Sequence, residues 1–291
     1  MRQRLLLLCL LLLPLGGCLS MPKYVPLDPV EQKDLKQIRA QSSISQDEII
    51  VVARNSNVSA AMGGGLLGAL IDSSIAKNRQ KGIQDTIEPF YAATDDVDFR
   101  KDFWAALLST LKQSYPVKVT DVKTSPLVLT RAEHEKLLAE LPPGDGYSYV
   151  GTRYTFTPDY SRLEIYTGID IWRAGKPEPI YSNLFHYQSK PVPAGIDPMK
   201  LWSENNGRLY RETVAEGIGE TMKMLKLDMQ FPQQPASGTG TATAPTAAKT
   251  VTLKKLGLAG PIDVTGNTLD EQTTRVVLRN AADGRLLSLP R

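Results

Sequence analysis

Three successive stretches of alternating residues between positions 147 and 188 constrain the fold of this chain more than any other feature. In the middle stretch, Ser161 to Arg173, mostly apolar residues occupy every second position. That set is Leu163, Ile165, Thr167, Ile169 and Ile171, and the residues between are Glu164, Tyr166, Gly168, Asp170 and Trp172. Because successive residues of a strand point to opposite faces, the pattern predicts a strand with one packed and one amphipathic face. Turn residues separate it from the stretches 147–156 and 180–188, so we predict an antiparallel three-strand meander.

Helical patterns on both sides of this meander set the fold class. Residues 96–114 have apolar side chains at helical spacing, and a capping box opens a second, shorter helix over 130–141. A long helix is predicted over 199–227, although its three glycines disfavour a helix interior. With further strands predicted over 48–54 and 117–122, the expected class is α+β, a mixed or antiparallel sheet packed against helices.

Composition divides the chain into five parts. Residues 1–17 form an apolar leader, and the polar, proline-containing residues 18–47 predict a tether. The α+β domain is expected over 48–231, followed by a low-complexity linker over 232–250 that is rich in Pro, Ala, Thr and Gly. The remaining stretch, 251–291, is a small β-rich tail in which two apolar runs around a turn predict a C-terminal β-hairpin appendage.

The N-terminus has the features of a bacterial export signal. Arg2 and Arg4 precede an apolar run of eleven residues, which is too short to span a bilayer because a helix needs roughly 20. The run ends in Leu-Gly-Gly-Cys at Cys18, and this ending resembles the lipobox of bacterial outer-membrane lipoproteins. The resemblance implies cleavage before Cys18, acylation of this cysteine, and a periplasm-facing place on the outer membrane, since Leu19 and not Asp follows.

The cysteine count and the charge exclude several kinds of chemistry. Cys9 lies within the leader and Cys18 would carry lipid, so the mature chain has neither a thiol nor a disulfide. The formal net charge of +3 falls to about +1 without Arg2 and Arg4, and no concentrated basic stretch predicts nucleic-acid binding. The two histidines lack zinc-ligand spacing, so we expect no metal and no other cofactor.

The fourteen residues from Val58 to Ile71 contain no charge and are rich in glycine. Ala60, Gly64 and Gly68 are four positions apart and would form one flat, small-residue face on a helix. Such a face packs against another helix of the same fold, a second copy of the chain or lipid, and a simple loop is the remaining interpretation. These three residues are therefore candidate packing or oligomer contacts.

Aromatic residues gather in the meander, but no catalytic motif accompanies them. Tyr166 and Trp172 fall on the amphipathic face of the middle strand, where they form either a structural ladder or an interaction face for a protein or glycan. The sequence has no nucleophile elbow, phosphate-binding loop or metalloprotease motif, so no catalytic residue is assigned. His186 becomes a candidate base only if a carboxylate lies within hydrogen-bond reach.

The body of the chain resembles uncharacterised proteobacterial lipoproteins. The similarity rests on the glycine-rich segment, on Pro158-Asp159 between two strands, and on the stretch Tyr181 to Gln188, which reads Tyr-x-Asn-x-Phe-x-Tyr-Gln. The order of elements is also similar to that of curli-secretion lipoproteins and of lipoprotein activators of peptidoglycan synthases, in layout only. Neither resemblance implies catalytic residues.

These observations predict a non-enzymatic, lipid-anchored component of the cell envelope. It would bind or assemble with an envelope protein or with itself, and the C-terminal tail would dock on the main domain or add a strand to a partner. Two alternatives stay open. One is a self-assembling part of a secretion or export apparatus that uses the glycine-rich segment. The other is a periplasmic hydrolase of an envelope polymer, built around His186.

Overall fold

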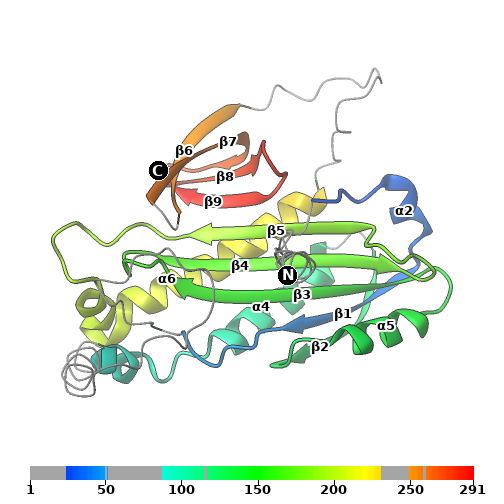
Figure 1. Ribbon diagram of the computed structural model, residues 1–291, viewed down its shortest axis with the longest axis horizontal. Helices are drawn as coiled ribbons and strands as arrows, with labels where there is room; N and C mark the ends of the chain where they lie inside the picture. Colours follow the sequence, from blue (N-terminus) through cyan, green and yellow to red (C-terminus); the bar gives the residue numbers. More distant parts are fainter. Residues whose placement is uncertain (1–23, 50, 52–86, 115–116, 231–248, 258–259) are drawn as a thin grey trace, which may run out of the picture.

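Nine strands form one mixed sheet (Figure 1). The computed structural model describes residues 24–49, 51, 87–114, 117–230, 249–257 and 260–291. The strands are β1 (Gln37–Ser43), β2 (Val119–Ser125), β3 (Asp145–Phe156), β4 (Leu163–Arg173), β5 (Tyr181–Gln188), β6 (Thr250–Gly257), β7 (Gly260–Glu271), β8 (Arg275–Asn280) and β9 (Leu286–Pro290). Their order across the sheet is β2-β1-β3-β4-β5-β9-β8-β7-β6. The predicted α+β class is confirmed.

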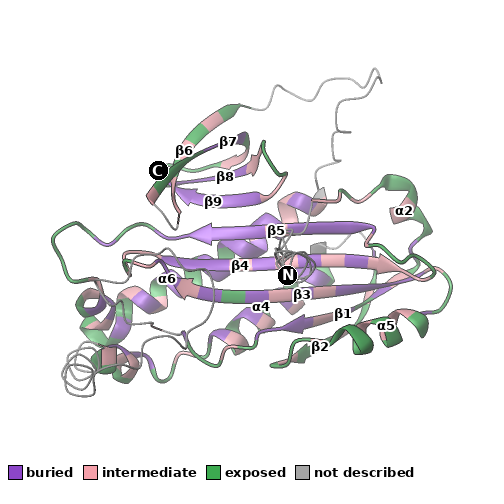
Figure 2. Ribbon diagram, in the orientation of Figure 1, coloured by how far each residue is buried: buried purple, intermediate pink, exposed green. Residues whose placement is uncertain are grey.

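Two long helices cover one face of this sheet. The described helices are α2 (Pro29–Asp34), α4 (Phe99–Ser114), α5 (Arg131–Ala139) and α6 (Pro198–Gln230), and residues 87–94 are also helical. Both α4 and α6 lie behind the sheet in Figure 1. Figure 2 shows buried positions along the central strands and these helices. The main core contains Ile165, Phe103 and Trp202, all almost fully buried. Among the residues that the structure describes, no helix is long and apolar enough to cross a membrane.

The predicted meander is confirmed as β3, β4 and β5. Strand β4 pairs antiparallel with both neighbours, and Gly151 of β3 stands opposite Gly168 of β4. The alternation of β4 is confirmed as well, because its apolar set is buried while Tyr166, Gly168 and Trp172 keep partial exposure on the other side. We call this second side, opposite α4 and α6, the outer face of the sheet.

The prediction that residues 18–47 form a tether is wrong for the described part of that range. Strand β1 lies between β2 and β3 and runs parallel to both. Sequence reasoning missed it because its buried positions include Ile38, Ala40 and Ser42, of which only Ile38 has a high preference for strands. The folded domain therefore begins well before residue 48.

The strand predicted over 48–54 is absent at its described residues. Ile49 is buried in the core, but the Tyr91 hydroxyl donates to its carbonyl oxygen (3.0 Å) and accepts from the Val51 N–H (3.1 Å). A side chain thus supplies the hydrogen bonds that a neighbouring strand would otherwise supply. Residues 50 and 52–54 lie outside the described residues.

The predicted helices are confirmed, and the longest one has a break. Thr130 and Glu133 form both hydrogen bonds of the capping box at the start of α5. In α6, the backbone leaves the helical conformation at Glu204, and Asn205, Asn206 and Gly207 follow with φ of 53°, 57° and 65°. A Cβ atom on Gly207 would lie 2.8 Å from the Ala93 carbonyl oxygen, which explains the glycine at this position.

Replacing the other two glycines of α6 by alanine is expected to change the stability of the protein in opposite directions. A Cβ atom on buried Gly217 would lie 2.6 Å from Ile165 Cδ1 and 2.9 Å from the Tyr187 ring, whereas exposed Gly219 has no atom within 4 Å. We expect Gly217→Ala to lower the free energy of unfolding by about 1–3 kcal/mol through overpacking. Gly219→Ala should raise it by about 0.5–1 kcal/mol through helix propensity. Urea unfolding of the two variants in parallel checks this, and shifts of equal sign would contradict it.

The C-terminal tail continues the main sheet. The predicted hairpin is confirmed as β8 and β9, and β6 and β7 precede it as two further antiparallel strands. Strand β9 runs parallel to β5 over three residue pairs, among them His186 with Leu287. A second apolar cluster belongs to the tail, with Val276, Leu278 and Leu287 at its centre. Of the two expected outcomes for the tail, docking on the main domain is the one observed.

Buried polar groups secure this docking. The Arg275 side chain is only 3% exposed and donates to the Gln188 carbonyl oxygen (2.9 Å) and to Glu216 Oε1 (2.8 Å) of α6. Its guanidinium also lies 4.5 Å from the centre of the Tyr187 ring, within cation–π range. One arginine of the tail thus binds both β5 and the covering helix α6 of the main domain.

A second junction joins the N-terminal segment, the sheet, α6 and the tail around one carboxylate. The Asp228 side chain is completely buried and accepts hydrogen bonds from Tyr181, from Asn183 Nδ2 (2.8 Å) and from Arg279 of β8. The Tyr24 ring lies 5.0 Å from the Arg279 guanidinium, and burial raises the pKa of Tyr24 to about 12. Four distant parts of the sequence therefore meet around the Asp228 carboxylate: the N-terminal segment, β5, α6 and β8.

Candidate functional site

The two residues predicted as an interaction face both lie on the outer face, but at different places. Trp172 is covered by α5, because the His134 ring lies 4.3 Å from it, and Tyr147 of β3 contributes a third ring at 6.4 Å. This end of the face is a structural aromatic cluster. Tyr166 lies six residues away along β4 and has other neighbours, so the structure does not bring Tyr166 and Trp172 together.

A patch of bare backbone lies between these two aromatic groups. Gly151 and Gly168 are directly paired, and the nearest atoms to a Cβ on either would be Tyr149 Cε1 at 3.6 Å and Leu184 Cδ1 at 4.0 Å. We call Tyr149, Gly151, Tyr166, Gly168 and Leu184 the glycine patch, and all five are partly exposed among the described residues. Glycine inside a strand weakens it and often marks a place where another chain or a ligand comes close.

Tyr166, at the border of the glycine patch, is held between two cationic or titratable groups. Its ring stacks on the His186 ring with a centroid distance of 4.2 Å and an interplanar angle of 5°, and the Arg153 guanidinium lies 4.7 Å from its centre. The hydroxyl donates to Glu164 Oε2 at 3.1 Å, and burial raises the pKa of Tyr166. These contacts fix the ring without hiding it completely, which suits an anchor residue of an interface.

His186 meets a carboxylate, as the hydrolase alternative requires. Its Nε2 lies 3.1 Å from Glu164 Oε1, and Gln188 Nε2 donates to the same oxygen at 2.7 Å. Burial lowers the pKa of His186 to about 4, so the ring is neutral at pH 7. Burial also acts to raise the pKa of Glu164, but the hydrogen bonds from His186, Gln188 and Tyr166 outweigh it and lower this pKa. The neutral ring therefore carries its proton on Nε2, and Nδ1 is left as an acceptor.

The pair does not line the pocket that lies beside α6. His186 is 2% exposed, and Glu164 already accepts three hydrogen bonds from side chains. Within the described parts of the chain, no group of three or more histidine, cysteine or acidic residues can hold a metal ion. The geometry at Glu164 and His186 is that of a buried structural pair, whose unusual feature is the unpartnered Nδ1.

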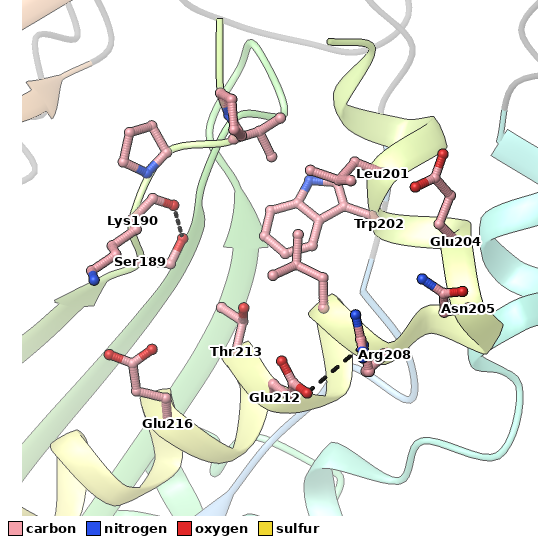
Figure 3. A pocket seen from close by; sticks show the side chains of 14 residues that line it. Ser189, Lys190, Leu201, Trp202, Glu204, Asn205, Arg208, Glu212, Thr213 and Glu216 are labelled. Atoms are coloured by element: carbon pink, nitrogen blue, oxygen red, sulfur yellow. Dashed lines mark hydrogen bonds and ion pairs between the residues drawn. The ribbon is translucent and has the colours of Figure 1, made fainter.

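A pocket of about 430 Å³ lies on the other side of the sheet, between the segment that follows β5 and the break in α6 (Figure 3). Leu201, Trp202 and Leu209 supply apolar lining, while Arg208 and Glu212 form a 4.0 Å ion pair at its border. Its volume is in the range of small-molecule sites. Sequence reasoning missed this pocket, and the Asn-Asn-Gly run at the break was the available signal.

The remaining predicted site residues lie outside the described residues. These are Cys18 and the candidate contacts Ala60, Gly64 and Gly68. No protein-family model matches the sequence, and no curated protein matches it significantly.

Proposed function

We propose that this chain is a non-enzymatic, lipid-anchored protein of the cell envelope that binds a protein partner through the outer face of its sheet. The lipobox-like ending at Cys18 supports the anchor and a periplasm-facing place on the outer membrane. The observation that carries the binding function is the glycine patch, because partly exposed tyrosines border a stretch of sheet without side chains. Tyrosine is enriched at the centres of protein interfaces, where its ring adds contact area at low entropic cost.

The two alternative functions have less support. A self-assembling export component would use Ala60, Gly64 and Gly68, which lie outside the described residues. A periplasmic hydrolase is favoured by the 3.1 Å contact between His186 and Glu164. Both residues of that pair are buried, however, and neither lines the pocket beside α6.

Filling the glycine patch tests the proposal. The Cβ of Gly168→Val has no atom nearer than 4.0 Å, and valine favours strands, so this variant should fold at least as well as the wild type. A photoreactive amino acid at Tyr149 reports the partner in intact membranes. We expect Gly168→Val to lower the yield of the crosslinked partner about tenfold, which corresponds to a loss of about 1.4 kcal/mol of binding.

Two controls accompany this experiment. Gly219→Ala changes a glycine on the helical side and should leave the crosslinks unchanged, and a photoreactive residue at exposed Glu178 should capture a different set of neighbours. Undiminished crosslinking in a folded Gly168→Val protein would reject the glycine patch as the binding surface. Crosslinks only between copies of this chain would support the self-assembling alternative.

A further inference from the structure

Strand β2 lies at the lower border of the sheet in Figure 1, and among the described residues it pairs with no strand except β1. The two strands are parallel, and their register is regular from Asp121 to Ser125. The Ser125 carbonyl oxygen accepts from the Ile44 N–H at 3.3 Å, so the backbone of Ser125 faces β1. This direction alternates along a strand, so the N–H and carbonyl groups of Val122 and Thr124 face the open edge. They can accept a further strand.

The charges on β2 are complementary to themselves. Asp121 and Lys123 flank Val122, and both are exposed. Neither forms an ion pair with a residue that the structure describes, although Arg39 of β1 is in register with Asp121. When two copies of β2 lie antiparallel with Val122 opposite Val122, each Asp121 stands opposite Lys123 of the other copy.

The backbone geometry fits the same arrangement. Because the polar groups of Val122 face the open edge, the two Val122 residues form a hydrogen-bonded pair. Asp121 and Lys123 of the other copy then form non-hydrogen-bonded pairs, in which the side chains of two antiparallel strands lie closest. Opposite charges at such positions stabilise the pairing of the strands. Backbone direction and side-chain charge therefore select one and the same register.

The opposite edge of the sheet lacks this property. Strand β6 contains Lys254 and Lys255 and no acidic residue. Lys254 already forms an ion pair with Asp263 of β7. Lysines on an edge strand are a common protection against pairing with another chain. The charges of β6 thus oppose symmetric pairing, whereas those of β2 favour it.

Two apolar side chains lie next to the open edge. Leu127 and Val128 follow β2 directly and are 74% and 60% exposed. They are the one pair of neighbours in sequence among the large hydrophobic residues that are exposed in the described part of the chain. In the antiparallel arrangement they lie near the start of β2 in the second copy, where Val119 is half-buried. Exposed apolar groups beside an open strand edge are typical of an interaction site.

We propose that two copies of this chain join through β2, so that their sheets become one continuous sheet with a two-fold axis at Val122. Two reciprocal backbone hydrogen bonds between the Val122 residues and two ion pairs between Asp121 and Lys123 hold the contact. The contact is isologous, so it closes after two copies and does not continue into a filament. This inference goes beyond the proposed function and is independent of it, because it uses neither the glycine patch nor the lipid anchor.

Exchange of the charges tests this register. Two differently tagged full-length copies are produced in the same cells and are co-purified from a detergent extract of those cells. Asp121→Lys or Lys123→Asp on both copies places like charges opposite each other twice and should lower the co-purified yield about tenfold. The double variant Asp121→Lys/Lys123→Asp restores opposite charges and should recover the wild-type yield. Asp121→Lys on one copy combined with Lys123→Asp on the other should recover it as well.

A matched lysine supplies the control. Lys254→Asp reverses an exposed charge on the opposite edge strand and should change the co-purified yield by less than about twofold. Asp121 and Lys123 are exposed, so their variants should stay folded, which circular dichroism checks. The proposal is overturned if wild-type copies do not co-purify, or if the single variants co-purify as well as the wild type. It is also overturned if the mixed single variants do not recover the yield, or if Lys254→Asp lowers it equally.

Discussion

Asp228→Ala is expected to lower the free energy of unfolding by about 3–5 kcal/mol, the cost of breaking a buried ion pair by removing one partner. The substitution leaves the Arg279 guanidinium, only 20% exposed, without its counter-charge. It also removes the carboxylate oxygen that accepts from the Tyr181 hydroxyl and from the Asn183 amide. Urea unfolding followed by tryptophan fluorescence measures the effect on the main domain, which holds all three tryptophans.

A matched aspartate controls this prediction. Asp263 also pairs with a cation, Lys254, but its side chain is 64% exposed. Asp263→Ala should therefore change the free energy of unfolding by no more than about 0.5 kcal/mol. The double variant Asp228→Ala/Arg279→Met should recover part of the loss, because it removes the uncompensated charge. If Asp228→Ala lowered the free energy of unfolding by less than about 1 kcal/mol, this carboxylate would not be the group that stabilises the junction.

Cys18→Ser is expected to transfer the protein completely from the membrane pellet to the soluble fraction. The proposed anchor is acyl chains on Cys18, each CH₂ of which contributes about 0.8 kcal/mol of membrane binding. The assay is membrane fractionation together with incorporation of labelled palmitate. The second cysteine provides the control, because Cys9 lies inside the leader and Cys9→Ser should leave both readouts unchanged. Membrane retention of unlabelled Cys18→Ser would mean that another part of the chain holds it there.

The elements that sequence reasoning predicted best are those with a strong local signal. The alternation of β4 needed no partner to be recognised, and the Thr130–Glu133 box at the start of α5 is equally local. Strand β1 has no comparable signal, since its polar side chains fit the sheet only through pairing with β2 and β3. Its position depends on contacts with residues about a hundred positions later.

The candidate sites depended even more on distant contacts. The two faces of β4 were predictable, but the pairing of Gly151 with Gly168 requires the register of β3 and β4. The meeting of His186 with Glu164 requires the register of β5 in the same way. The Gln188 side chain meets Leu256 of β6 only because the tail folds back on β5. Periodicity predicts which side of a strand a residue occupies, whereas register determines its neighbours.

The early start of the folded domain would limit how far a chain acylated at Cys18 extends from the membrane. Val25 is already bonded to β5, where its N–H and carbonyl oxygen pair with Ser182 at 2.9 Å each. In a chain acylated at Cys18, only residues 19–24 separate the lipid from this fixed point, and six residues reach roughly 20 Å at full extension. The sheet would then stay within about one domain diameter of the bilayer. Partners of the outer face must then be found at the membrane surface and not across the periplasmic space.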